Sequence, residues 1–174
     1  MRTLFAAAAA LVLALPAVAA DKVTLNGDNT KITFVGTKPG GKHDGGFKTL
    51  TGTATVEGDA LQALEVEIDT ESLYADDPKL TAHLKSPDFF SVKANPKAKF
   101  TSKKIEKTDG GHKVTGDLTI NGKTKEVSFP VTVSRAGGVK IETSFTIDKR
   151  DFGMTYGGGK INDEVAIKAV VEAK

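Results

Sequence analysis

Residues 114–131 read VTGDLTINGKTKEVSFPV and hold two rows of alternating side chains around an Asn-Gly pair. Successive side chains of a strand point to opposite faces, so each row predicts a strand with one dry and one wet side. Asn121-Gly122 suits a two-residue turn, which needs positive φ at both central residues. The stretch therefore predicts an antiparallel β-hairpin.

The same period of two recurs along most of the chain, and glycine-containing turns at 57–59, 109–111 and 137–138 separate the rows. Shorter runs at 49–56 and 98–105 add further strands to the set. Eight strands with short turns favour a barrel or a two-sheet sandwich, and a barrel leaves no unpaired edge. We therefore expect an all-β protein with an antiparallel eight-stranded barrel. The apolar faces of the other rows are Ile32 and Phe34; Leu64, Val66 and Ile68; Val127, Phe129, Val131 and Val133; Val139, Ile141, Phe145 and Ile147; and Val165, Ile167, Ala169 and Val171.

One helical crossover interrupts the strands. Asp77 is a suitable N-cap and Pro78 suits the first helical position. Ser86 precedes Pro87, which discourages continuation of a helix. The sequence predicts a short helix over 77–85 and a further single turn directly after it.

Phe89 and Phe90 stand in the polar, broken stretch LKSPDFFSVKANPKAKFTS, residues 84–102. A crossover of this kind can lie over one end of a barrel, with an apolar underside and a charged top. Two interpretations stay open, because the rings either cover the end of an open interior or fill a solid core.

The first twenty residues, MRTLFAAAAALVLALPAVAA, have the form of a secretory signal peptide. Their apolar run is shorter than the roughly 20 residues of a spanning helix, so a retained anchor is less favoured. We expect a signal peptide over 1–20, a single domain over 21–174, and a periplasmic or secreted protein without stable membrane insertion. The chain has no Cys, which excludes disulfides, thiol chemistry and a lipid-modified cysteine.

The charges give no support to a nucleic-acid or anionic-membrane partner. The sequence has 24 Lys and Arg against 22 Asp and Glu, and Arg2 belongs to the expected signal peptide. Binding of nucleic acid or of anionic lipid surfaces needs a clear excess of basic residues.

Catalytic and metal motifs are weak. The three histidines, His43, His83 and His112, are scattered, and neither G-x-S-x-G nor H-E-x-x-H occurs. We expect no enzyme activity, no metal and no cofactor. Arg150 lies between Asp148 and Asp151, where an ordinary surface ion pair competes with a role at a ligand head group.

Residue size decides whether such a barrel is full or hollow. An eight-stranded barrel can be filled by its side chains or can hold one small ligand. The chain has no Trp, and the stretch 47–56 supplies mainly small residues. A wall of small and β-branched residues permits space along the axis but does not demand it.

Three stretches carry a family resemblance: LTAHLKSPDFFSVKANPKAKFTS (80–102), VTGDLTINGKTKEVSFPV (114–131) and FTIDKRDFGM (145–154). In order and spacing they resemble the signature stretches of the YceI-like family, over most of the chain from residue 21. The resemblance implies a lipocalin-like antiparallel barrel whose elongated interior binds a long isoprenoid or a related amphiphile, such as a quinone. It also implies an exported protein.

The expected site follows from the inward rows and this implied cavity. Glycine-rich stretches at 37–47 and 156–160 are expected to form loops that shape its mouth. His83 and Arg150 are possible contacts of a polar head group. The expected ligand contacts are Leu64, Val66, Ile68, Phe89, Phe90, Phe100, Leu118, Phe129, Ile141, Phe145, Phe152, Met154 and Ile167.

Three functions stay open at this point. The favoured one is a carrier, store or scavenger of the lipid. The alternatives are an enzyme that modifies such a lipid in the same cavity, and a ligand-free, stress-related structural module. A homodimer that shares an open mouth would shield a lipid tail, although no exposed apolar row in the sequence requires it.

Overall fold

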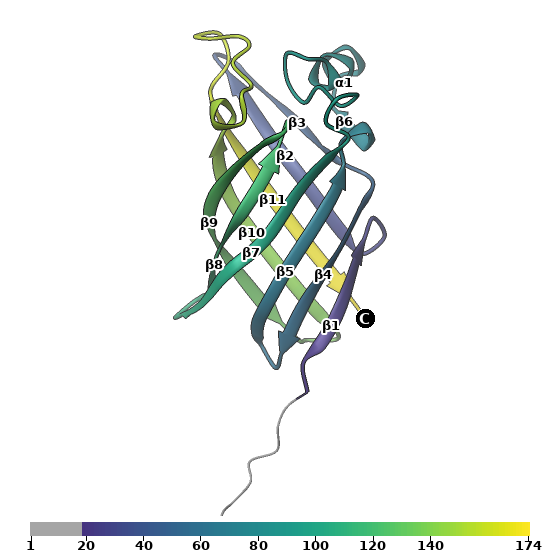
Figure 1. The fold of residues 1–174 in the computed structure, drawn as a ribbon, viewed down its shortest axis with the longest axis vertical. Helices are drawn as coiled ribbons and strands as arrows, with labels where there is room; N and C mark the ends of the chain where they lie inside the picture. The colour runs from purple at the N-terminus through teal and green to yellow at the C-terminus, as the bar shows by residue number, and fades with distance from the viewer. Residues whose placement is uncertain (1–18) are drawn as a thin grey trace, which may run out of the picture.

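The computed structural model describes residues 19–174, which form a curled antiparallel sheet of the lipocalin-like barrel class (Figure 1). The expected signal peptide, residues 1–20, lies outside the described residues except for its last two. Among residues 19–174, no helix combines the length and the apolarity that a membrane crossing requires.

Within the described residues the sheet has eleven strands, in the order β1-β4-β5-β7-β8-β9-β10-β11-β2-β3-β6, and every neighbouring pair is antiparallel. The strands are β1 (Asp21–Asn26), β2 (Thr30–Lys38), β3 (Gly41–Phe47), β4 (Leu50–Glu57), β5 (Ala60–Asp69), β6 (Leu73–Ala75), β7 (Lys97–Thr108), β8 (Gly111–Ile120), β9 (Lys123–Ser134), β10 (Val139–Asp148) and β11 (Glu164–Ala173). The helical elements are η1 (Thr70–Ser72), α1 (Pro78–Lys85) and η2 (Lys149–Phe152).

The predicted class is confirmed, but the count of eight strands is wrong. The additional strands are β1, β3 and β6. The order also begins at β1 and ends at β6, so among the described residues the curled sheet keeps two edges that the sequence did not predict.

Strand β3 replaces the glycine-rich loop that the sequence predicted over 37–47. It pairs with β2 along its whole length and with β6 near its end. A Cβ on Gly45 would lie 2.3 Å from the ring of Phe34, and one on Gly46 would lie 2.7 Å from the hydroxyl of Tyr74. The glycines therefore make room for neighbouring rings, and the pairing overrides their low strand propensity.

The hairpin at 114–131 is confirmed. Ile120 pairs with Lys123 across Asn121 and Gly122, whose φ angles are 50° and 70°. Both central residues are therefore left-handed, as the predicted turn requires.

One end of the barrel carries the turns β4–β5, β7–β8 and β9–β10, and we call it the turn end (Figure 1). It is solidly packed by apolar side chains such as Val56, Val114 and Val131, each at most 1% exposed. Arg135, beside the β9–β10 turn, donates hydrogen bonds to the carbonyls of Gly58 (2.6 Å) and Val56 (3.4 Å). This half of the barrel is a conventional hydrophobic core.

The opposite end, the roofed end, carries α1, η2 and the segments 86–96 and 153–163 (Figure 1). The predicted helix is confirmed, because α1 begins at Pro78 and the Asp77 carboxylate accepts a hydrogen bond from the Leu80 amide at 2.8 Å. The predicted turn follows, since the Phe89 amide donates to the Ser86 carbonyl at 3.1 Å.

The two halves of the roof touch each other through aromatic rings. Tyr156 in segment 153–163 packs edge-on against His83 of α1, with 4.6 Å between the ring centroids. Phe89 lies 5.5 Å from the same tyrosine. The crossover after β6 and the crossover after η2 thus meet across the end of the barrel.

Candidate ligand cavity

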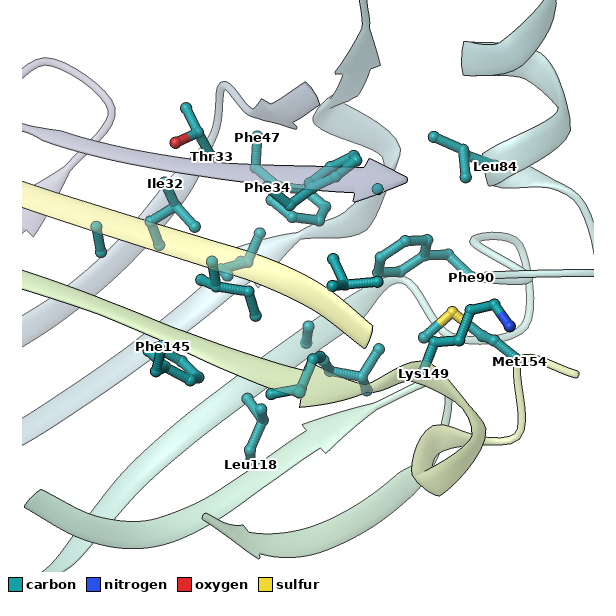
Figure 2. Close-up of a pocket in the computed structure, with 18 of the residues that line it drawn as sticks. Ile32, Thr33, Phe34, Phe47, Leu84, Phe90, Leu118, Phe145, Lys149 and Met154 are labelled. Atoms are coloured by element: carbon teal, nitrogen blue, oxygen red, sulfur yellow. The ribbon is translucent and has the colours of Figure 1, made fainter. Parts of the chain in front are cut away.

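A cavity of about 240 Å³ occupies the roofed half of the barrel (Figure 2). Its wall comes from the sheet, and its cover comes from α1, the turn that follows α1, and segment 153–163. The cavity is lined by Ile32, Thr33, Phe34, Gly36, Thr37, Lys38, His43, Phe47, Leu64, Val66, Ile68, Leu80, Leu84, Phe89, Phe90, Ala98, Lys99, Phe100, Leu118, Ile120, Phe129, Thr143, Phe145, Ile147, Lys149, Met154, Ile161, Asn162, Val165, Ile167 and Ala169.

The apolar side chains of the wall are not fully covered by their neighbours. Ile68, Phe145 and Ile167 line the cavity, yet each is only half-buried. An inward apolar side chain that keeps accessible surface faces open space. Side chains here do not fill the barrel, in contrast to the turn end.

Three phenylalanines form the floor of the cavity, which we define as Phe100, Phe129 and Phe145. The rings of Phe129 and Phe145 are stacked, with centroids 4.4 Å apart and planes 12° apart, and Phe100 lies 5.0 Å from Phe129. Nearer the turn end, Val131 of β9 and Ile141 of β10 are buried and do not line the cavity. On β10 the open space therefore ends just beyond this floor, between Thr143, which lines the cavity, and Ile141, which does not.

A second aromatic group lies nearer the roof. Phe47 packs against Phe34 at 6.0 Å and edge-on against Phe90 at 5.7 Å, and all three rings line the cavity (Figure 2). Phe34 and Phe47 were not among the predicted contacts. Phe47 ends a stretch that reads as a glycine loop, whereas the alternation of Phe34 with Ile32 was the signal that could have placed Phe34 on the wall.

All predicted contact residues except Ile141 and Phe152 line this cavity. Ile141 is 4% exposed and lies below the floor, in the core of the turn end. Phe152 is 1% exposed because it is packed within the hydrophobic core at the end of η2. The alternation of β10 placed Ile141 on the correct face but could not say how far the void extends.

The two predicted head-group contacts do not line the cavity. The Nε2 atom of His83 lies 2.9 Å from Oδ2 of Asp88, and its ring packs against Phe89. Arg150 points to the outside, where its side chain is 58% exposed and bonds to both carboxylate oxygens of Asp148. The hydrogen bond from Arg150 lowers the pKa of Asp148 to about 2. Of the two roles that the sequence offered for Arg150, the surface ion pair is present.

Lys149, the neighbour of Arg150, does line the cavity. Its side chain is only 6% exposed, and its Nζ atom pairs with Oδ1 of Asp163 at 2.5 Å. The sequence concealed this residue, because the run Asp148-Lys149-Arg150-Asp151 reads as uniformly exposed. The tight turn of η2, whose N-cap is Asp148, sends Lys149 inward and Arg150 outward.

Polar groups gather at the rim of the cavity near the roof. Asn162 donates a hydrogen bond to the Thr37 hydroxyl at 2.7 Å and so joins segment 153–163 to β2. The Nδ1 atom of His43 lies 3.0 Å from Oδ1 of Asp76, a hydrogen bond that lowers the pKa of Asp76. A few polar side chains therefore lie at the rim near the roof, while the surface of the cavity is almost entirely apolar.

Two comparisons with solved structures show the same fold. The crystal structure of Burkholderia cenocepacia BcnA has a TM-score of 0.76 and 27% identity, and the match covers 83% of this chain and 96% of that one. A polyisoprenoid-binding domain from Saccharophagus degradans has a TM-score of 0.68 over 88% of this chain and 98% of that one. At 16% identity, the second likeness shows the fold alone.

Comparison with known sequences shows which family the chain belongs to. A UPF0312 protein of Serratia proteamaculans is 30% identical over 136 residues, which cover 74% of this chain and 68% of that protein. The sequence model of the YceI-like domain matches residues 23–173. The match covers the entire sheet from Val23 onward, together with the roof and the cavity, and the chain belongs to the YceI-like family.

Proposed function

We propose that this protein binds a long-chain isoprenoid or a similar amphiphilic lipid inside the cavity, as a carrier, store or scavenger. The observation that carries the proposal is an apolar void of about 240 Å³ inside a barrel whose other half is packed. The solved relative from Saccharophagus degradans, described as a polyisoprenoid-binding domain, supports the same class of ligand.

The size of the void suits a lipid chain. An enclosed water takes about 10–15 Å³ on this measure, so 240 Å³ holds roughly 20 groups of that size. Burial of about 20 methylene-sized groups at about 0.8 kcal/mol each gives on the order of 15 kcal/mol before the costs of ordering the chain and of losing its free motion. An apolar tunnel of this size can therefore retain a lipid without any specific hydrogen bond.

The predicted residues that line the wall would contact the chain, with Phe34 and Phe47 added and with Ile141 and Phe152 left out. The long isoprenoid and quinone-like ligands named above share the required long apolar tail. The leader-like residues 1–20 support export to the periplasm or beyond, where such a protein would meet lipids that have left a membrane.

Binding is favoured over the two alternatives. A ligand-free module has no use for a void of this size, since empty space weakens packing. An enzyme would need a nucleophile beside a base, and among the described lining residues there is neither Ser nor Cys. His43 at the rim is oriented by Asp76, as a general base can be, but no Ser or Cys among the described lining residues accompanies it.

The direct test is mass spectrometry of an organic extract from protein purified out of its native host. We expect a long-chain lipid recovered chemically unchanged and in near-stoichiometric amount. An extract free of lipid, from protein that also fails to take up a long-chain lipid in vitro, would contradict the proposal. Recovery of a modified lipid together with its precursor would point to the enzyme instead.

Phe145→Trp tests whether the lipid occupies this void. The larger indole would fill space at the floor, so we expect retention of the copurified lipid to fall at least tenfold while the protein stays folded. Ser144→Trp is the matched control, because residue 144 points to the outer face of the same strand and is exposed. Equal retention by both variants would remove Phe145 from the proposed contacts.

A further inference from the structure

Lys149 places a charged group beneath the roof of an otherwise apolar cavity. Figure 2 shows its side chain beside Met154 and Phe90, at the end of the cavity opposite the floor. The side chain is 6% exposed. A buried ammonium is strongly unfavourable unless it is paired and its hydrogen bonds are satisfied. Such a residue in a ligand cavity therefore requires a partner.

The protein satisfies the hydrogen-bonding capacity of the Lys149 ammonium only in part. An ammonium has three donors, and the one side-chain hydrogen bond that Nζ makes within the described residues goes to Oδ1 of Asp163. Asp163 is shared, because its Oδ2 atom lies 3.2 Å from the guanidinium of Arg150. The carboxylate that neutralises Lys149 thus also serves a second cation.

Lys149 and Asp163 face different regions of the molecule. Lys149 lines the cavity, whereas Asp163 does not and instead lines a shallow polar depression on the outer surface with Asp148 and Arg150. A molecule inside the barrel therefore meets the Lys149 side chain and not the carboxylate of Asp163. The other end of the cavity is dominated by the rings of Phe100, Phe129 and Phe145.

We propose that Lys149 determines both the head-group class and the orientation of the ligand. The ligand carries an acceptor oxygen, as on a carboxylate, a carbonyl or a phosphate, which takes the donors of Lys149 that Asp163 leaves open. The head lies under the roof, and the tail runs toward the phenylalanine floor. This inference rests on the proposed lipid function, because it concerns the same cavity.

Lys149→Met is the sharpest test, since methionine is unbranched and apolar. Asp163 keeps Arg150 as a partner in this variant, so its carboxylate is not left alone. Three probes of equal chain length, hexadecanoate, hexadecan-2-one and hexadecane, are compared by displacement of an apolar fluorophore from the cavity. Lys140→Met, on the outer part of β10 with a side chain 43% exposed, is the matched control.

We expect the wild-type protein to bind the two oxygenated probes at least tenfold more tightly than hexadecane. Lys149→Met should lose that preference and bind hexadecane as well as before, while Lys140→Met should behave as the wild type. A loss confined to hexadecanoate would assign an anionic head, and a loss for both oxygenated probes would assign any acceptor oxygen.

Two outcomes would overturn the inference and can be told apart. A wild-type protein that binds all three probes alike would leave lipid binding intact and remove the role of Lys149. A folded wild-type protein that binds none of them would remove both proposals. If Lys149→Met does not fold, Lys149→Gln keeps a donor without the charge, and an unchanged preference for hexadecanoate over hexadecane in that variant would contradict an ionic role.

Discussion

Single residues determine where the interior of this barrel is polar, and sequence patterns predict the position of these residues least well. Lys149 and Arg150 are adjacent and chemically alike, yet one is buried in the cavity and the other is exposed on the outer surface. Period-two alternation ends with β10 at Asp148, so it gave no guide to the residues of η2. Leu118 and Phe129 lie inside strands, and their alternation sufficed to place them on the wall.

His112 is a second residue whose environment could not be read from the sequence, where it directly follows the turn glycines 110 and 111. It is 7% exposed, and its Nε2 atom accepts a hydrogen bond from the Leu61 amide at 3.3 Å. Nδ1 therefore carries the proton of the neutral ring, and it is buried without a partner among the described residues. Burial, and secondarily the charge of Lys107, lower the pKa of His112.

This environment predicts a pH dependence of stability. Because the pKa of His112 is lower in the folded state than the ordinary value of 6.5, the unfolded chain takes up the proton first as pH falls. Stability should be complete above about pH 6.5 and should decrease below it, until the folded-state pKa is reached. Urea unfolding between pH 7.5 and 5.5 measures this slope. His112→Leu should flatten it, and a slope that is unchanged in this variant would assign the effect to other groups.

At the scale of elements, the strongly alternating strands and α1 were predictable, whereas β1, β3 and β6 were not. Strand β3 contains three glycines and two charged side chains in seven residues, and only its pairing with β2 and β6 holds it extended. Strand β6 has three residues, too few to show a period. The helix was predictable because its N-cap and first-turn proline are local signals that need no tertiary partner.

Helix α1 is the weakest element of the roof, because none of its residues is fully buried. Asp77→Ala removes the bond to the Leu80 amide and should cost the helix about 1 kcal/mol. We expect faster amide exchange over 78–85 and faster release of a bound lipid, with little change in the melting temperature. Asp109→Ala, in the β7–β8 turn, is the control. Release that stays as slow as in the wild type would show that α1 does not limit ligand exit.

The molecule as a whole combines a packed half and a hollow half in one continuous sheet. The fold class followed from periodicity alone, since each strand reports its own dry face. The cavity could not be predicted from periodicity, because it depends on the radius of the curled sheet and on how far the side chains reach across it. Val114 and Leu118 belong to the same row of β8, yet only Leu118 borders the cavity.

Arg135 joins parts of the sheet that lie far apart in strand order. Besides the carbonyls of Gly58 and Val56, it pairs with Asp21 of β1 at 2.7 Å. Arg135→Ala should therefore lower the free energy of unfolding by about 1–2 kcal/mol, seen as an earlier urea midpoint. Asp21→Ala removes only an exposed ion pair and should cost less than about 1 kcal/mol. Equal costs for the two variants would show that the carbonyl bonds contribute nothing.

The floor of three phenylalanines separates the packed half of the barrel from the half that contains the cavity. Side chains on its far side pack solidly against one another, whereas several on its near side, such as Phe145 and Ile167, are only half-buried and face the cavity. A change at one of these half-buried side chains alters what fits inside and removes less buried packing than a change in the turn end. Tolerance to mutation should therefore be highest among the half-buried residues that line the cavity. A few substitutions there could change which ligand fits while the melting temperature stays near its original value.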